Sequence, residues 1–276
     1  MKELQELIRE FSKDEKVYPE ILERLKNDDV IYAALSPATH SCYLNYENQK
    51  PTAYIFSKEE YYADFADHML QQQIGLRCGE VYKDDRKAFF ADLARSGFEM
   101  LVVDNGQQYL VMSLFDIIQK PTFTNLPKDK RPIMNMELMR CANLFFQELA
   151  VARATREQEA MMFKAIYEAK YLLPLQSEKP DDEIDAKGQR IIFPQLVNAD
   201  GMKFQPFFTD WNEFKKYDAE AKLGGYVAGF DVMKDFMKNA DGIVINPFGF
   251  KLILNAGMID TIEKTVKEEL AEPAQE

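Results

Sequence analysis

The polar residues best suited to chemistry lie between positions 200 and 246, beside aromatic runs. Asp200, Thr209, Asp210 and Asn246 supply carboxylates, a hydroxyl and an amide. Carboxylates and amides can carry out acid–base chemistry without histidine, so these groups could orient a ligand amine or a water. The structural interpretation is that Thr209 caps a helix and Asp210 complements the helix dipole. The sequence leaves both interpretations open.

A turn motif, Asn246-Pro247-Phe248-Gly249, closes this region. Its backbone amides could line a pocket. The alternative is a turn between two buried strands, in which Pro247 fixes φ and Gly249 takes a positive φ. Trp211 could anchor an interface or pack over the neighbouring hairpin. The candidate ligand- or partner-binding residues are therefore Asp200, Phe208, Thr209, Asp210, Trp211, Asn246 and Pro247.

Motifs of nucleophilic, metal and nucleotide chemistry are missing from the sequence. Its two histidines are His40 and His68, and no Cys-x-x-Cys or His-x-x-x-His pattern completes four ligands around His40 and Cys42. There is no Gly-x-Ser-x-Gly elbow, and Gly224-Gly225 lacks the other residues of a phosphate-binding loop. We therefore assign no catalytic residue, expect no metal and no cofactor, and favour a non-enzymatic protein.

The elements that would position these residues occur twice in the same order. Helices lead into a short strand, predicted over residues 30–35 in one half and 171–175 in the other. An aromatic strand then runs directly into a helix start. Ser57 and Thr209 stand at these two junctions, each with the hydroxyl that an N-cap requires.

Each half then ends alike. A short helix is predicted over residues 87–95 and over 231–239, and each is followed by two strands joined by a turn. Asp200-Gly201 between apolar runs predicts a hairpin in the second half. Pro194 and Pro206 each remove a backbone donor, so we expect their strands to lie at an edge or to pair on one side only. The fold class is predicted as α+β, with two similar mixed, mainly antiparallel sheets flanked by helices, produced by tandem duplication.

The predicted organisation is a first repeat over 1–118, a linker over 119–133, a second repeat over 134–262, and a terminal helix and tail over 263–276. The linker is rich in proline and basic residues. The helices predicted within 134–169 carry adjacent Met and Phe residues, so their apolar surface is wider than one stripe. They would pack between the halves or meet a partner.

The second repeat resembles the SseB N-terminal domain family, a bacterial family named from a serine-sensitivity phenotype. The resemblance covers roughly residues 160–260 and rests on Leu172-Leu173-Pro174-Leu175, Phe193-Pro194, Asp200-Gly201, Phe204, Pro206, Phe207-Phe208-Thr209-Asp210 and Gly242 to Gly249. The first repeat departs from this pattern, with Phe56-Ser57-Lys58 and Asp104-Asn105 at the matching places. The resemblance implies an α+β domain and supplies no catalytic residues.

The charge and the cysteine content narrow the function further. With 34 basic and 46 acidic residues the net charge is −12, which disfavours nucleic acid and anionic membranes as partners. Three cysteines are typical of a chain in the reducing cytoplasm. The leading hypothesis is a non-enzymatic cytoplasmic module that binds a protein or peptide. The alternative is a small-molecule binder or carboxylate-based enzyme with a site near the second-half hairpin. The sequence does not indicate an oligomeric state.

Overall fold

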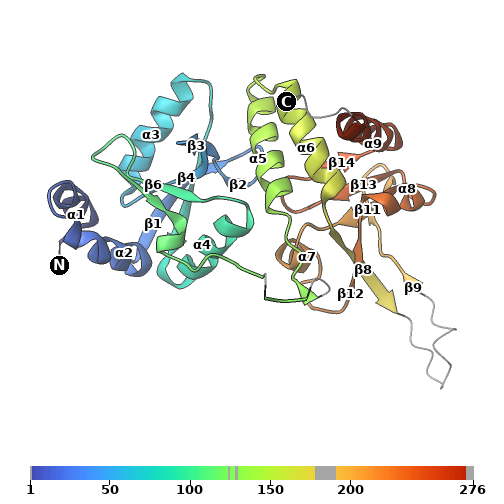
Figure 1. Ribbon diagram of the computed structural model, residues 1–276, viewed down its shortest axis with the longest axis horizontal. Coiled ribbons are helices and arrows are strands. Elements are labelled where there is room, and N and C mark those ends of the chain that lie inside the picture. Colours follow the sequence, from blue (N-terminus) through green and yellow to red (C-terminus); the bar gives the residue numbers. More distant parts are fainter. Residues whose placement is uncertain (1, 124, 128–129, 178–190, 272–276) are drawn as a thin grey trace, which may run out of the picture. The chain divides into compact units, whose positions relative to one another are not determined.

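The computed structural model describes residues 2–123, 125–127, 130–177 and 191–271 (Figure 1). The chain divides into two compact units. The first unit comprises Met1–Asn125 and Ala142–Ala154, and the second comprises Leu126–Cys141 and Thr155–Glu276. Helix α5 (Met136–Ala150) therefore contributes residues to both units. The repeat and linker boundaries given above stay predictions.

In the first unit, the strand predicted over residues 30–35 and the helix predicted over residues 87–95 are both present. Its helices are α1 (Leu4–Phe11), α2 (Tyr18–Asn27), α3 (Glu59–Gln71) and α4 (Arg86–Arg95). Its strands are β1 (Val30–Ser36), β2 (Ser41–Cys42), β3 (Asn45–Glu47), β4 (Lys50–Phe56), β5 (Arg77–Tyr82), β6 (Met100–Val103) and β7 (Leu110–Ser113). A 3₁₀ turn, η2 (Lys83–Asp85), leads into α4.

One mixed sheet forms the middle layer of the first unit. Its order is β2-β1-β4-β6-β7, with β3 added on β4 and β5 added on β1, and β4 and β6 run parallel. Side chains alternate between the two faces of a strand, so each face has its own core. One face packs against α1, α2 and α4 through residues such as Leu7, Leu25 and Phe90. The other face packs against the apolar stripe of α3, formed by Tyr62, Phe65 and Met69.

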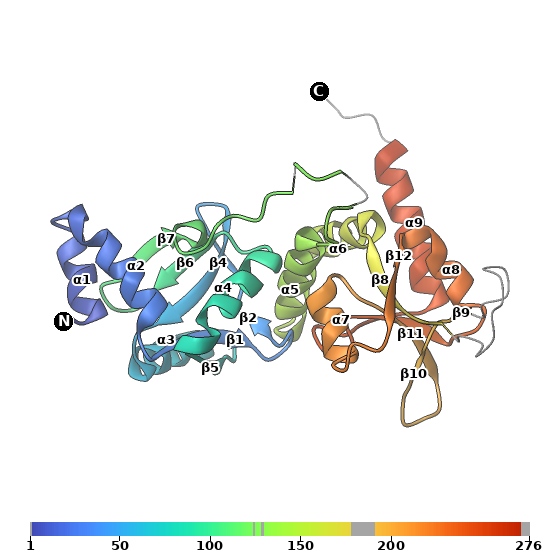
Figure 2. The same ribbon diagram turned by 90° about the horizontal axis from the view of Figure 1, so that it is seen from below.

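The second unit has the same kinds of element. Its helices, besides the start of α5, are α6 (Arg156–Glu168), α7 (Trp211–Tyr217), α8 (Met233–Phe236) and α9 (Ala256–Ala271). Its strands are β8 (Tyr171–Ser177), β9 (Ile191–Ile192), β10 (Leu196–Val197), β11 (Lys203–Phe207), β12 (Gly224–Ala228), β13 (Gly242–Ile245) and β14 (Leu252–Leu254). Helix α9 lies beside α6 and α8 (Figure 2).

Two short sheets form the middle of the second unit, β10-β11-β13-β14 and β12-β8-β9. A bridge between Leu172 and Phe208 joins them. On one face Phe207 packs edge-on against Phe236 of α8 at 5.8 Å. On the other face Phe208 packs against Phe214 and Tyr217 of α7, at 5.3 and 5.6 Å. This unit therefore also has helices on both faces of its strands.

The strand pairings of the two units correspond in order and direction throughout the described residues. β1 pairs antiparallel with β2, β4 and β5, and β8 pairs antiparallel with β9, β12 and the residue that follows β11. β3–β4 matches the antiparallel pair β10–β11, β4–β6 matches the parallel pair β11–β13, and β6–β7 matches the antiparallel pair β13–β14. The α+β fold class with mixed sheets is thus confirmed, and tandem duplication stays a prediction.

Two predicted helices have different bounds in the structure. The helix expected over 231–239 is a 3₁₀ turn over Phe230–Val232 followed by one turn of α-helix, α8. After Phe236 the bonds run from residue i to i−3, because Lys238 donates to the Asp235 carbonyl and Asn239 to the Phe236 carbonyl. The terminal helix begins at Ala256 rather than at 263, because the Asn255 side chain accepts the Met258 N–H and starts the helix there.

Candidate functional site

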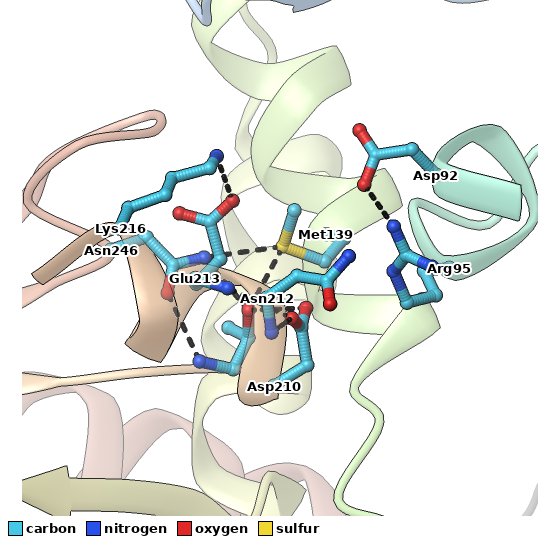
Figure 3. Close-up of polar contacts among 9 residues, drawn as sticks. Asp92, Arg95, Met139, Asp210, Asn212, Glu213, Lys216 and Asn246 are labelled. Carbon is cyan, nitrogen blue, oxygen red and sulfur yellow. Dashed lines mark hydrogen bonds and ion pairs between the residues drawn. The ribbon is translucent and has the colours of Figure 1, made fainter. Parts of the chain in front are cut away.

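Asn246 and Thr209 form the centre of the predicted site in the second unit. The Asn246 Oδ1 atom accepts the Thr209 backbone N–H at 3.0 Å, and its Nδ2 donates to the Thr209 hydroxyl at 2.8 Å. The Met139 sulfur of α5 lies 3.3 Å from Nδ2 and 3.2 Å from the hydroxyl (Figure 3). We call the four residues Met139, Thr209, Asp210 and Asn246 the Thr209 cluster.

Asp210 joins this cluster as the N-cap of α7. Its Oδ1 accepts the backbone N–H groups of Asn212 and Glu213 at 2.7 and 3.0 Å, and its Oδ2 lies 3.3 Å from the Thr209 hydroxyl (Figure 3). The expectation that Thr209 is the N-cap is therefore wrong. Thr209 is one residue too early, because its N–H and hydroxyl are both held by Asn246 and the chain enters the helix at Trp211.

The role expected for Gly249 also changes. Asn246 takes the positive φ in this turn, at 47°, a conformation that asparagine tolerates better than most residues. Gly249 is not among the glycines with positive φ. A Cβ at Gly249 would lie 2.9 Å from the Glu213 Oε2 atom, so a larger residue there would displace the end of the Glu213 side chain. Glu213 itself is buried and pairs with Lys216 (Figure 3).

The Thr209 cluster has almost no polar capacity left for a substrate. Thr209 and Asn246 are fully buried and Asp210 is 5% exposed. The amide of Asn246 and the carboxylate of Asp210 are engaged in bonds to the chain itself, as buried polar groups usually are. The arrangement fixes the junction between β11 and α7.

The first unit holds a matching arrangement, the Ser57 cluster of Gln5, Ser57 and Asp104. The Asp104 carboxylate accepts the Ser57 N–H at 2.7 Å, the Ser57 hydroxyl at 2.8 Å and the Gln5 amide at 3.0 Å. Asp104 is fully buried and has φ of 58°. Burial raises the pKa of its carboxyl, although the bonds from Ser57 and Gln5 oppose this. Asp104 therefore occupies the position of Asn246, and α1 supplies Gln5 where α5 supplies Met139.

The other predicted site residues do not converge on this cluster. Asp200 lies at the tip of the β10–β11 hairpin, at the opposite end of β11 from Thr209. Phe208 is fully buried under α7. Trp211 packs on Gly225 of β12 rather than over the hairpin, since a Cβ at Gly225 would lie 2.6 Å from its ring. Pro247 lines a different feature, an open groove.

The open groove lies on the sheet β10-β11-β13-β14 and has a volume of about 540 Å³. Its apolar lining includes Val197, Met202, Phe204, Val244, Phe248 and Ile253, and Asp241 and Lys251 border it. Val197, Phe248 and Ile253 are 62%, 51% and 42% exposed. The sequence did not reveal this groove. The signal that could have found it is the alternation of Phe204, Pro206 and Phe208, which assigns apolar residues to one face of β11.

The equivalent face of the first unit is covered by α3. Val102 pairs with Val111 there as Val244 pairs with Ile253 in the second unit, and Val102 is buried in the core that contains Phe65 and Met69. Both α3 and α7 begin three residues after the matching phenylalanine, Phe56 or Phe208. Helix α3 has 13 residues and α7 has seven, so the turns that carry Met69 have no counterpart in α7.

The early end of α7 has a local cause. The Asp218 carboxylate accepts the N–H groups of Lys222 and Leu223 at 3.0 and 2.8 Å. These bonds hold a loop that turns the chain toward β12 directly after Tyr217. A side chain that bonds nearby backbone groups competes with helix continuation. The face beyond Tyr217 is consequently left open.

Neither a metal-ligand cluster nor a candidate membrane-spanning helix occurs among the described residues. In that part of the chain, no group of three or more His, Cys, Asp and Glu side chains is arranged to hold a metal ion. None of the described helices is both long and apolar enough to cross a bilayer.

Comparison with protein-family models matches residues 147–260 to the SseB protein N-terminal domain. The resemblance predicted for residues 160–260 is thereby confirmed for this segment. It contains β8 to β14, the open groove and the Thr209 cluster apart from Met139. No curated protein and no solved structure matches the chain.

Proposed function

We propose that the SseB-type domain of this chain is a non-enzymatic interaction module, and that its open groove receives one amphipathic helix of a protein partner. The observation that carries the proposal is the contrast between the units. The last turns of α3 cover this sheet face in the first unit, whereas the open groove on the corresponding face of the second unit has no residue of a described helix in its lining. A helix laid in an apolar groove is a recurrent mode of peptide recognition.

The charges at the two ends of the open groove favour one direction for the partner helix. Asp241 precedes β13 and Lys251 precedes β14, so these residues lie at opposite ends of the strand pair. Helix α3 starts at the end that corresponds to Lys251 and has Glu59 and Glu60 in its first turn. A partner helix in the same direction would place acidic first-turn residues near Lys251 and a basic last turn near Asp241. That distribution also suits the helix dipole.

The expected affinity is modest. Burial of an exposed apolar side chain contributes on the order of 1.5–3 kcal/mol, and the groove offers Val197, Phe248 and Ile253 as the main exposed anchors. Association and ordering of the partner offset much of this gain. We therefore expect reversible, micromolar-range binding, as is typical of a module that exchanges partners.

The alternative of a carboxylate-based enzyme or small-molecule site at the Thr209 cluster has less support. It requires polar groups that are free to meet a substrate, and the groups of Asp210 and Asn246 are engaged in the cap and the turn. We place the module in the cytoplasm. This is supported by the net charge of −12 and by Cys42, Cys78 and Cys141, which are all free thiols.

The proposal can be tested with a probe taken from the chain itself, an acetylated and amidated peptide of residues 59–71. The isotope-labelled full chain is titrated with this peptide and backbone amide shifts are followed by NMR. We expect shifts concentrated at Val197, Phe204 and Ile253. A peptide with Phe65→Ser and Met69→Ser is the matched control and should produce none.

The Ile253→Asp variant supplies the second arm, because it places a charge in the middle of the open groove. We expect this variant to keep its dispersed spectrum and to lose the peptide-induced shifts. Equal shifts in wild type and variant, or shifts confined to the first unit, would contradict the proposal. Binding of the control peptide with the same strength would contradict the requirement for an apolar helix face.

A further inference from the structure

A cavity of about 410 Å³ in the first unit gathers four cationic side chains. Lys26 of α2, Lys83 of η2, and Arg86 and Lys87 of α4 all line it. No carboxylate is among its lining residues in the described part of the unit. The chain as a whole is acidic, with a net charge of −12. The four cations around this cavity therefore make a local concentration of positive charge. We call this the lysine cavity.

Arg86 is the buried member of the set. It is 2% exposed, and its guanidinium donates to the carbonyl oxygens of Leu25, Asp28 and Val81. These neutral acceptors satisfy its terminal nitrogens but do not neutralise its charge, and Nε has no hydrogen-bond partner. The Asp28 carboxylate acts on Arg86 electrostatically but forms its ion pair with Arg24, so the cost of burying the Arg86 cation is only partly offset. An anion held in the cavity would lower this cost.

The second unit shows that the fold does not require a cation at this position. Arg86 follows the 3₁₀ turn after β5, and the residue that follows the corresponding turn after β12 is Met233. Met233 is fully buried and apolar. The positive charge is therefore a property of the first unit, where an apolar side chain of similar length would also fill the space.

The surrounding charges leave the cavity positive. Lys26, Lys83 and Lys87 have no ion-pair partner among the described residues. The acidic residues on the neighbouring segments are Asp28, which pairs with Arg24 at 2.9 Å, and the exposed Asp29, Asp84 and Asp85. Arg86 and Lys87 also stand in the first turn of α4, which contains no acidic residue. The partial positive charge of a helix N-terminus adds to theirs.

The opposite side of the lysine cavity is apolar. Phe90, Ile117 and Ile118 line it there. We propose that the lysine cavity binds a small phosphomonoester whose ester group is apolar, with the phosphate at the lysines and the ester group against Phe90 and Ile117. Lysine ammonium groups are compact charges that suit a phosphate dianion, and the volume is within the range of small-molecule pockets. This inference does not depend on the open groove of the second unit.

Phenyl phosphate is the probe for this site. Binding to the full chain is measured by calorimetry and located by the NMR shifts of the Ile117 and Ile118 methyl groups. We expect saturable binding that weakens as ionic strength rises, since exposed charges are screened. Inorganic phosphate should bind more weakly, and phenol should not bind, because each lacks one half of the recognised structure.

Two double charge-reversal variants with the same net charge distinguish binding at the lysine cavity from an effect of the overall charge of the protein. Lys83→Glu with Lys87→Glu should weaken phenyl phosphate binding at least about tenfold. Lys13→Glu with Lys16→Glu, on exposed residues outside the cavity, should leave it within about twofold. The milder Lys83→Gln with Lys87→Gln repeats the test if the reversal unfolds the unit. Equal weakening by both pairs, binding without methyl shifts, or no binding to wild type overturns the proposal.

Discussion

Asn246 holds Thr209 by both its backbone N–H and its hydroxyl, at 3.0 and 2.8 Å. Asp104 holds Ser57 by the same two groups in the first unit. In each case the holding residue has positive φ, directly follows a central strand, and accepts the N–H of a residue one or two positions after the end of the neighbouring parallel strand. The two bonds fix the point at which the following helix starts, three residues after Phe56 or Phe208, and the length of that helix then decides how much of the sheet face it covers.

Asp104→Asn tests how much the buried carboxylate costs. The pKa of Asp104 is raised in the folded protein, so its contribution to the free energy of unfolding falls as pH rises from about 4 through the folded pKa. At pH values above the folded pKa, the free-energy cost of burying the ionised Asp104 carboxylate no longer changes with pH. The Asp104→Asn substitution removes that cost. Asn can keep the bond from the Ser57 N–H and donate to Gln5, whose Oε1 has no partner.

We expect the free energy of unfolding of Asp104→Asn at pH 7, from urea unfolding, to lie within about 1 kcal/mol of wild type or above it. Its dependence on pH should be flatter. Asp104→Ala should lose roughly 2–3 kcal/mol, because the donors of Ser57 and Gln5 are left unsatisfied. Equal losses in the two variants would show that the charge itself stabilises the cluster.

Asn246→Asp tests the role of Met139, which in the second unit takes the place that Gln5 has beside Asp104. The Thr209 N–H and hydroxyl can still donate to a carboxylate, but Met139 has no hydrogen to offer where Gln5 donates to Asp104. We expect a loss of roughly 2–4 kcal/mol in urea unfolding. Adding Met139→Gln should recover at least about half of it, with Met139→Gln alone as the control. Strict additivity of the two changes would contradict the equivalence of the clusters.

Asp210→Ala tests the corrected N-cap. Removal of the carboxylate leaves the N–H groups of Asn212 and Glu213 without their acceptor, and we expect a loss of about 1–2 kcal/mol in urea unfolding. Asp210→Asn should cost under about 0.5 kcal/mol, because asparagine caps helices nearly as well. A larger loss for Asn than for Ala would indicate that the charge of Asp210 has another role.

The three thiols provide a test of the first unit and α5. Burial raises the pKa of all three, to about 11 for Cys78 and about 12 for Cys141. The thiolate fraction at pH 7 is therefore small, and Cys78 alone is exposed. We expect iodoacetamide to label native protein slowly and at Cys78 first, at a rate that rises with pH. In urea all three should react at similar rates, and labelling of Cys42 before Cys78 would contradict the structure.

The sequence predicts local elements well because their signals are local. The short apolar run over residues 30–35 indicates the strand there, and Asp200-Gly201 indicates the hairpin, in which Gly201 takes φ of 81°. The N-cap of α7 was misplaced by one residue, since Thr209 and Asp210 are both suitable caps. The choice between them is made by Asn246, 37 positions away.

The candidate site was less predictable. Thr209, Asp210 and Asn246 lie together, and their role as a binding site stays a prediction. Their bonds to the chain itself depend on packing that spacing does not encode. The open groove results from helix length: α7 ends at Tyr217 because Asp218 bonds the loop that follows. The sequence pattern shows an apolar face on β11 but not which helix covers it.

The central claim is that the sheet face left bare by α7 binds an apolar helix. The direct measurement is the dissociation constant of a fluorescent peptide of residues 59–71, by anisotropy, for the full chain and for Ile253→Asp. Leu270→Asp, an equally drastic change at an exposed apolar residue of α9, is the matched control. We predict that Ile253→Asp weakens binding at least about tenfold and that Leu270→Asp leaves it unchanged. Equal affinity in all three proteins would contradict the account.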